Sequence, residues 1–176
     1  HSRRRVLQRQ SPSATRTTSM AADPTEVLVG LDIGTTGVKA IAVTPDGRVL
    51  GVAEQGYPLS TPRTGWSEQD PEDWWRATRA ALAGLREQIG VGSEIAGIGL
   101  SGQMHGATLL DARDVVLRPA ILWNDGRSAL ECEALERAVP ASRAITGNLA
   151  MPGFTAPKLL WVRAHEPDVF ARVRRV

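Results

Sequence analysis

The sequence predicts an α/β domain built on a mixed β-sheet. Apolar runs of strand length lie at 27–33, 37–44 and 48–57, a capped helical pattern follows at 71–88, and another apolar run lies at 95–100. Strands that are followed by a helix and then by a further strand are typical of α/β folds. With 176 residues, of which 42% are hydrophobic, the chain has enough material for one domain with a core.

The first two strands are predicted to form a hairpin around the tip Gly34-Thr35-Thr36-Gly37. "TPDGRV" at 44–49 supplies an Asp-Gly turn into the third strand, so we expect an antiparallel meander.

The helix at 71–88 begins with a strong local signal. Asp70 is placed to cap it, Pro71 suits its first position, and Glu72 and Asp73 match the helix dipole.

The rest of the chain adds further elements. Ile95–Leu100 is expected to be a buried strand. Lys158 is expected to be a solvated charge on a short helix whose other residues pack against the core. A second hairpin is predicted at 107–123, turning at Asp111–Asp114, with helices at 127–138, 155–164 and 167–175.

The N-terminal segment differs in composition from the remainder. Residues 1–20 carry five arginines and no acidic residue, whereas acidic side chains outnumber basic ones in the rest of the chain. This head is interpreted as disordered and possibly non-native, with Met20 as the natural start; a nucleic-acid arm and an organelle transit segment are the alternatives. We therefore expect a head at 1–26 and a domain at 27–176.

Charge and cysteine usage limit the partners. A mildly acidic domain argues against nucleic-acid binding, and no apolar stretch is long enough to cross a membrane. The single Cys132 fits a reducing compartment, so a cytoplasmic location is expected.

The hairpin tip is a candidate phosphate site. Backbone N–H groups at a glycine-bearing turn, together with the hydroxyls of Thr35 and Thr36, suit phosphate oxygens. Gly34 and Gly37 would allow the close approach of a ligand, and Asp32 at the strand end would hold Mg²⁺ through water. The alternative is a simple surface turn with a surface aspartate.

Two further strand ends carry hydrogen-bonding groups. "GQMHGA" at 102–107 places Gln103, Met104 and His105 where a strand ends, a combination suited to a small polyol. "LWNDGR" at 122–127 offers Trp123, Asn124 and Asp125 as ligand contacts, or as a helix cap.

"GIGLSG" at 97–102 matches the dinucleotide-binding pattern G-x-G-x-x-G. That pattern requires a helix to open directly behind it, and the residues that follow are poor helix formers. Small residues packed in a strand explain it better.

Together, "GLDIGTTGVKA", "WSEQDPEDWW", "GLSGQMHGATLLD", "RPAILWNDGR" and "ITGNLAMPGFTAPKLLWV" resemble the FGGY carbohydrate kinases of the actin-like ATPase superfamily. The resemblance spans residues 27–176 and implies an actin-like (ribonuclease H-like) ATPase domain with a mixed sheet, present as an incomplete N-terminal domain.

The resemblance also implies ATP-dependent phosphorylation of D-xylulose or a similar ketose, with ATP and Mg²⁺ bound. Gly34, Thr35, Thr36, Gly37 and Lys39 would bind the phosphates, and Asp32 the metal. The sugar would be bound by Met104, His105, Gln103, Trp123, Asn124 and Asp125.

The general-base aspartate of the family is expected beyond Val176, so no catalytic residue is assigned within the chain, which is expected to be inactive alone. A homodimer of a full-length protein is compatible with the resemblance. The alternatives are a kinase for ribulose, gluconate or glycerol, a non-catalytic actin-like sugar-binding regulator, and a Rossmann-type oxidoreductase, for which only "GIGLSG" speaks.

Overall fold

The computed structural model describes residues 25–176, and the expectations for residues 1–24 lie outside this range. Thr25 and Glu26, which were predicted as part of the head, already belong to strand β1 (Thr25–Ile33). β1 pairs in antiparallel fashion with β2 (Gly37–Val43), which in turn pairs with β3 (Val49–Gly56). The predicted meander is therefore confirmed.

The sheet is completed by β5 (Ser93–Gly102), which runs parallel to β1. The strand order is β3-β2-β1-β5, so the sheet is mixed, as predicted. A crossover of this kind requires a connection long enough to return to the starting edge, and α1 (Pro71–Ile89) provides it. β5 ends without a helix directly behind it, which agrees with the rejection of a dinucleotide-binding motif.

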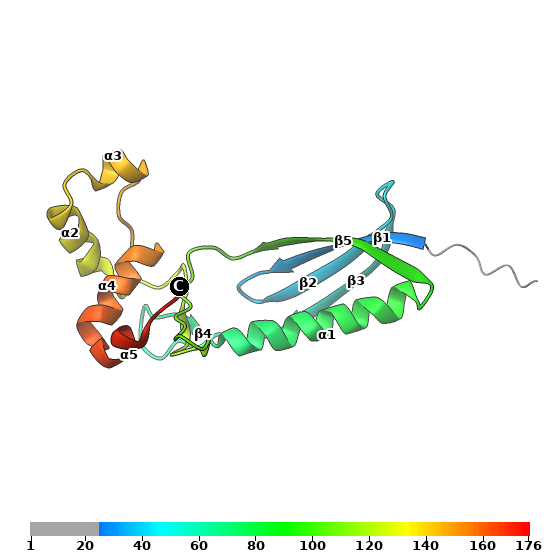
Figure 1. The fold of residues 1–176 in the computed structure, drawn as a ribbon, viewed down its shortest axis with the longest axis horizontal. Helices are drawn as coiled ribbons and strands as arrows, with labels where there is room; N and C mark the ends of the chain where they lie inside the picture. The colour runs from blue at the N-terminus through cyan, green and yellow to red at the C-terminus, as the bar shows by residue number, and fades with distance from the viewer. Residues whose placement is uncertain (1–24) are drawn as a thin grey trace, which may run out of the picture.

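Helix α1 lies along one face of the sheet (Figure 1). Its predicted start is confirmed, because the Asp70 side chain accepts a hydrogen bond of 3.0 Å from the Glu72 backbone N–H. The helix packs mainly on β2 and β3. The core between them consists of Val27, Val29, Leu31, Val38, Ala40, Ala42, Ala77, Ala81 and Leu85.

The expected burial of β5 is wrong within the described residues. Ile95, Ile98 and Leu100 are 42%, 56% and 74% exposed. Ile98 and Leu100 pair in register with Val29 and Leu31, which face α1, but α1 makes its contacts over β2 and β3 and does not extend across β5. The apolar sequence of β5 predicted a strand correctly. Its side chains are exposed because α1 lies over β2 and β3.

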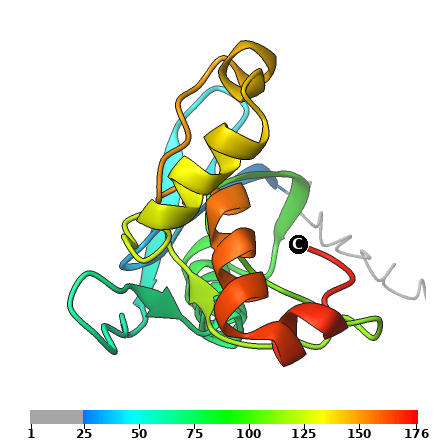
Figure 2. The same ribbon diagram turned by 90° about the vertical axis from the view of Figure 1, so that its left-hand side faces the viewer.

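The second half of the chain forms a separate layer of helices at the other end of the molecule (Figures 1 and 2). A short two-stranded ladder links the halves: β4 (Glu68–Gln69) pairs with β6 (Ala120–Ile121). Around it pack α2 (Ala129–Ala138), α3 (Ser142–Thr146), α4 (Thr155–His165) and α5 (Pro167–Arg172). Their core consists of Ala107, Leu109, Ile121, Trp161 and Val162.

Three details of this half differ from expectation. The hairpin predicted at 107–123 is reduced to β6 and isolated bridges such as Leu110↔Val116, with the turn at Asp111–Asp114 present. α3 was not predicted, and α5 ends at Arg172 because the chain then turns to pair with Leu110.

None of the helices in residues 25–176 is long and apolar enough to cross a membrane.

A pair of leucine substitutions tests the packing of α1. Leu85 is 1% exposed against the sheet, so Leu85→Ala should lower the free energy of unfolding by about 2–5 kcal/mol. Leu130 on α2 is 75% exposed, and Leu130→Ala should change it by less than about 0.5 kcal/mol. Urea titration followed by circular dichroism measures both, and equal effects would contradict the placement of α1.

Candidate functional site

The tip of the β1–β2 hairpin is fixed by hydrogen bonds. The Gly34 N–H donates to the Gly37 carbonyl at 3.0 Å, and the Tyr57 N–H donates to the Thr36 carbonyl at 3.4 Å. The Tyr57 hydroxyl also donates to the Gly34 carbonyl. A side chain at Gly37 would place its Cβ 2.6 Å from the Gln55 carbonyl oxygen, so only glycine fits there. The tip is thus a rigid turn.

The two threonines of the tip face different surroundings. Thr36 is exposed and lines a groove of about 290 Å³ with Asp32, Gly34, Gly37 and Lys39. Thr35 is half-buried, and its polar atoms bind other side chains of the protein. Although the sequence pattern grouped them together, Thr36 lines the groove, whereas Thr35 is hydrogen-bonded to the rest of the protein.

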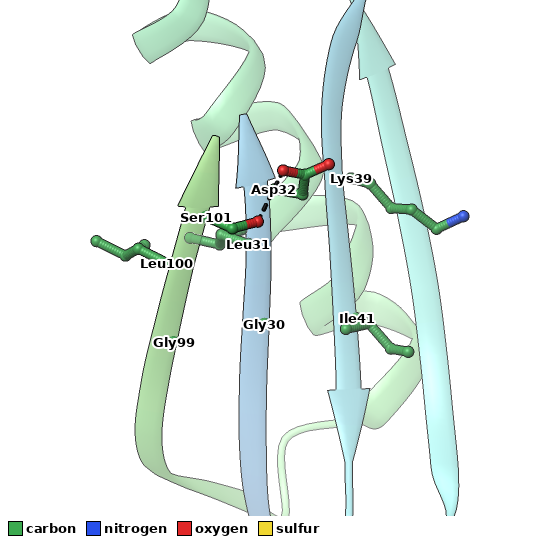
Figure 3. A pocket seen from close by; sticks show the side chains of 8 residues that line it. All are labelled: Gly30, Leu31, Asp32, Lys39, Ile41, Gly99, Leu100 and Ser101. Atoms are coloured by element: carbon green, nitrogen blue, oxygen red, sulfur yellow. Dashed lines mark hydrogen bonds between the residues drawn. The ribbon is translucent and has the colours of Figure 1, made fainter. Parts of the chain in front are cut away.

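Asp32 projects from the face of the sheet that α1 does not cover (Figure 3). Its carboxylate is exposed and accepts a hydrogen bond of 2.7 Å from the Ser101 hydroxyl on β5. No group of three or more His, Cys, Asp or Glu side chains within residues 25–176 is placed to hold a metal ion. A single carboxylate beside an open groove still fits Mg²⁺, which usually keeps several waters and is shared with substrate phosphates.

Lys39 lines the same groove but points across β3 and away from Asp32 (Figure 3). Its ammonium forms an ion pair of 2.8 Å with Glu54. The hydrogen bond with Glu54, together with the negative charge of that group, raises the pKa of Lys39 above its ordinary value. Because both side chains are more than half exposed, Lys39 would have to leave a weak surface pair to contact a phosphate.

The hairpin tip is joined to the two other strand ends by a chain of hydrogen bonds. The Thr35 hydroxyl donates to Gln103 Oε1 at 3.2 Å and accepts from Trp123 Nε1 at 3.0 Å. The Thr35 carbonyl accepts from Gln69 Nε2 at 2.6 Å. The three segments singled out in the sequence therefore meet at one place.

Gln69 lies at the centre of this network and was missed by sequence reasoning. It is 1% exposed, and its Oε1 accepts hydrogen bonds from Gln103 Nε2 at 3.0 Å and Trp74 Nε1 at 2.9 Å. Its segment was interpreted only as the entry to a helix. The available signal was a polar residue directly before a capping Asp-Pro, which does not reveal partners more than 30 residues away.

Met104 and His105 are both exposed at the end of β5. His105 has a φ of 63°, a left-handed conformation that is uncommon for residues other than glycine. Its ring lies 4.8 Å from that of Phe154, centroid to centroid. Two predicted sugar contacts are thus presented to solvent by a strained backbone.

The second segment that was predicted to contact a sugar, residues 123–125, divides into exposed and buried residues. Trp123 and Asn124 are exposed, whereas Asp125 is only 2% exposed. The Asp125 carboxylate accepts hydrogen bonds from the Ser67 N–H at 2.6 Å and from the Arg127 guanidinium at 2.7 and 2.9 Å. Burial alone would raise the pKa of Asp125, but these hydrogen bonds outweigh it and hold the pKa below its ordinary value. Asp125 therefore lies behind the surface that Trp123 and Asn124 present.

Arg127 belongs to a buried set of charges that links the ladder to the helices. It pairs with Glu68 at 2.7 Å and lies 3.7 Å above the Trp66 ring. Glu68 also pairs with Arg118 at 2.6 Å, and Arg118 with Glu166 at 2.8 Å. Charges buried this deeply are tolerated because each has an opposite partner, and removing one partner would leave the other uncompensated.

Lys158 is not the solvated charge expected from the sequence. It is fully buried in α4, and its Nζ donates to the carbonyls of His105 and Gly153, each at 2.6 Å. Burial lowers the pKa of Lys158 to about 8, the nearby Asp125 opposes this shift, and Arg127 adds to it. The residue was misjudged because the partners of its ammonium are backbone carbonyls, which leave no sequence signal.

The described residues thus form an α/β domain with a groove and an adjacent carboxylate at a hairpin tip, next to two polar strand ends. Residues 27–176 match the family described as "FGGY family of carbohydrate kinases, N-terminal domain". The chain belongs to this family, as the motifs predicted.

Relatives of known name agree with this membership. The chain is 55% identical over 148 residues to the xylulose kinase of Escherichia coli (strain K12), covering 84% of this chain and 30% of that protein. It is 45% identical over 147 residues to the xylulose kinase of Bacillus subtilis (strain 168), covering 82% and 30%. The chain thus spans about a third of the length of these relatives.

Solved structures give the same result. The crystal structure of a xyloylose kinase from Brucella ovis superposes with a TM-score of 0.81 at 55% identity, covering 85% of this chain and 31% of that one. The xylulose kinase from Rhodospirillum rubrum gives a TM-score of 0.80 at 39% identity, covering 84% and 31%. The mixed α/β architecture is therefore that of the sugar kinases.

The sequence contains two lysines, Lys39 and Lys158, and we predict that they titrate far apart. Lys158 should show a pKa of about 8, and Lys39 a pKa above its ordinary value. In protein labelled with ¹³Cε-lysine, NMR resolves the two curves, and Lys39→Met assigns them. Two midpoints above pH 10 would contradict the burial of Lys158.

The lowered pKa of Lys158 also determines how the free energy of unfolding depends on pH. Its pKa is lower in the folded chain than in the unfolded one, so the unfolded state binds more protons between pH about 8 and 10.5. The cost of burying the charge is fully present below pH 8 and is relieved as the pH rises through that window. The difference in free energy of unfolding between wild type and Lys158→Met should therefore shift in favour of wild type over this range.

Proposed function

We propose that this chain supplies the phosphate-binding and sugar-binding region of an ATP-dependent kinase that phosphorylates D-xylulose to D-xylulose 5-phosphate. One observation carries the proposal: the hydrogen bonds of Thr35 place the hairpin tip beside both sugar-side strand ends. A phosphoryl group bound at the tip and a sugar bound at those ends would lie close together. Such closeness is what direct transfer between two bound substrates requires.

On the phosphate side, the groove at the tip would take the phosphates of ATP. Thr36 would donate its hydroxyl, and Gly34 and Gly37 would leave room for the phosphate oxygens. Asp32 would hold Mg²⁺, which when bound neutralises charge on the phosphates. Catalysis of phosphoryl transfer relies mainly on such positioning and charge neutralisation.

On the sugar side, the exposed groups supply hydrogen bonds and an apolar edge. His105 and Asn124 would bind hydroxyls, while Met104 and Trp123 would cover the carbon chain. Gln103 would hold the loop through Thr35 and Gln69. Asp125 is occupied by Arg127, so we assign it the role of holding this segment in place.

D-xylulose is favoured among the candidate sugars by the names of the relatives. Several proteins named xylulose kinase share 39–55% identity with the matched region. A gluconate kinase from Lactobacillus acidophilus superposes with a TM-score of 0.77 at 27% identity, so gluconate is the second candidate. Side chains around the sugar, not the fold, would separate the two.

A chimera tests the proposal directly. Residues 27–176, the region that matches the family, replace the corresponding segment of the Escherichia coli xylulose kinase, with which this chain shares 55% identity over 148 residues. We expect ATP-dependent phosphorylation of D-xylulose, with lower kcat/KM for ribulose, gluconate and glycerol, measured by coupled ADP release. The isolated 176-residue chain is the control and should be inactive. A folded chimera that prefers another sugar would overturn the substrate assignment, and one inactive on all four would overturn the kinase proposal.

In the same chimera, Asp32→Asn should lower kcat/KM on the order of 100-fold, since it removes the charge that would hold the metal. The Mg²⁺ concentration for half-maximal rate should rise about tenfold. Asp168→Asn, on the exposed first turn of α5, is the charge-matched control. An unchanged Mg²⁺ dependence in Asp32→Asn would exclude Asp32 as the metal ligand.

A further inference from the structure

We propose that Lys158 is a positioning residue that holds the two sugar-side strand ends, at His105 and at Trp123, in a fixed relation to one another. The inference deepens the proposed function and rests on it where it concerns sugar binding. Lys158 is fully buried and does not line the groove at the hairpin tip, so it acts through the backbone that it binds.

The first of its two contacts fixes the His105 backbone. The chain is tied on one side by the Gln103 N–H, which donates to the Ile33 carbonyl at 2.8 Å, and on the other by Ala107, which pairs with Ile121. Between these ties, the His105 carbonyl accepts hydrogen bonds from Lys158 Nζ at 2.6 Å and from the Thr155 hydroxyl at 3.3 Å. A non-glycine residue at positive φ is strained and persists only when its surroundings hold it. Lys158 is the principal group that holds it.

The second contact fixes the other strand end. Lys158 Nζ donates to the Gly153 carbonyl at 2.6 Å, and the Gly153 backbone packs directly against Trp123. A Cβ added at Gly153 would lie 2.5 Å from the Trp123 carbonyl oxygen, so this contact tolerates no side chain. One ammonium group thus bridges the loop that carries Met104 and His105 and the loop that supports Trp123.

The chemistry of the group suits this bridge in either protonation state. A neutral amine keeps two N–H donors and an ammonium has three, so both carbonyls can be satisfied above and below the pKa of Lys158. Asp125 and Arg127 are the charged groups that act on it. A buried lysine that served only as a counter-ion would point at a carboxylate, whereas this one points at two carbonyls.

The conformation of His105 provides the first test, in the 176-residue chain itself. Lys158→Met should change the three-bond HN–Hα coupling and the Cα shift of His105, which report φ, and should shift the methyl signal of the neighbouring Met104. Arg163→Met, on the exposed side of the same helix, is the matched control and should leave them unchanged. If Lys158→Met does not fold, Lys158→Gln applies, since its shorter amide cannot reach both carbonyls. Retention of the left-handed signature in a folded variant overturns the proposal.

Kinetics in the chimera provide the second test. Lys158→Met should raise the KM for D-xylulose about tenfold, a loss of about 1.4 kcal/mol of binding, and leave the KM for ATP unchanged. Lys158→Cys, alkylated with 2-bromoethylamine while unfolded and then refolded, in a background from which Cys132 and the other cysteines of the chimera are removed, regains an amine of nearly the same length and should restore the KM. If the variant only contains less active enzyme, so that its apparent kcat falls while both KM values are unchanged, the positioning role is overturned. If the chimera with native Lys158 is inactive, the proposed function fails, and the His105 signature alone decides the role of Lys158.

Discussion

The arrangement of the candidate site depends on how the protein satisfies the polar atoms of Thr35. Its hydroxyl and carbonyl are bound by Gln103, Trp123 and Gln69, which come from three different segments. Half-buried polar atoms are costly when unpaired, so this network penalises any arrangement in which the hairpin tip and the two strand ends separate. The sheet and the helical layer have separate apolar cores, and the β1–β5 pairing already brings the end of β5 close to the hairpin. The Thr35 hydrogen bonds, with the β4–β6 ladder between the layers, fix the tip against both strand ends.

Several exposed candidate ligand-binding groups are next to a buried or half-buried group that holds their segment of backbone. Thr36 depends on Thr35, His105 on Lys158, and the Trp123–Asn124 segment on Asp125 with Arg127. The buried partners are polar or charged, which specifies geometry at the expense of desolvation. An apolar core would pack the same segments without fixing where their carbonyls and N–H groups point.

The sequence predicted features whose causes are local. The Asp70 cap, the glycine-bearing hairpin and the Asp-Gly turn depend on residues within a few positions of one another, and all are present. The burial of Lys158, the inward position of Asp125 and the exposure of β5 depend on segments that lie far away in the chain. The family motifs predicted where in the chain the candidate site lies. They did not distinguish side chains that face a ligand from side chains that hold the ligand-facing segments in place.

That distinction explains why a short motif such as "GQMHGA" or "LWNDGR" mixes chemically different residues. Within "LWNDGR", Trp123 and Asn124 are open to solvent while the next residue, Asp125, is buried in an ion pair. Within "GQMHGA", the side chain of Gln103 joins the interior network while Met104 and His105 face outward. Each motif therefore contains both a surface for a ligand and the attachment of that surface to the interior. A substitution in either part would weaken binding, but only one in the attachment would also change the backbone geometry of the free protein, and this is how the two roles are told apart.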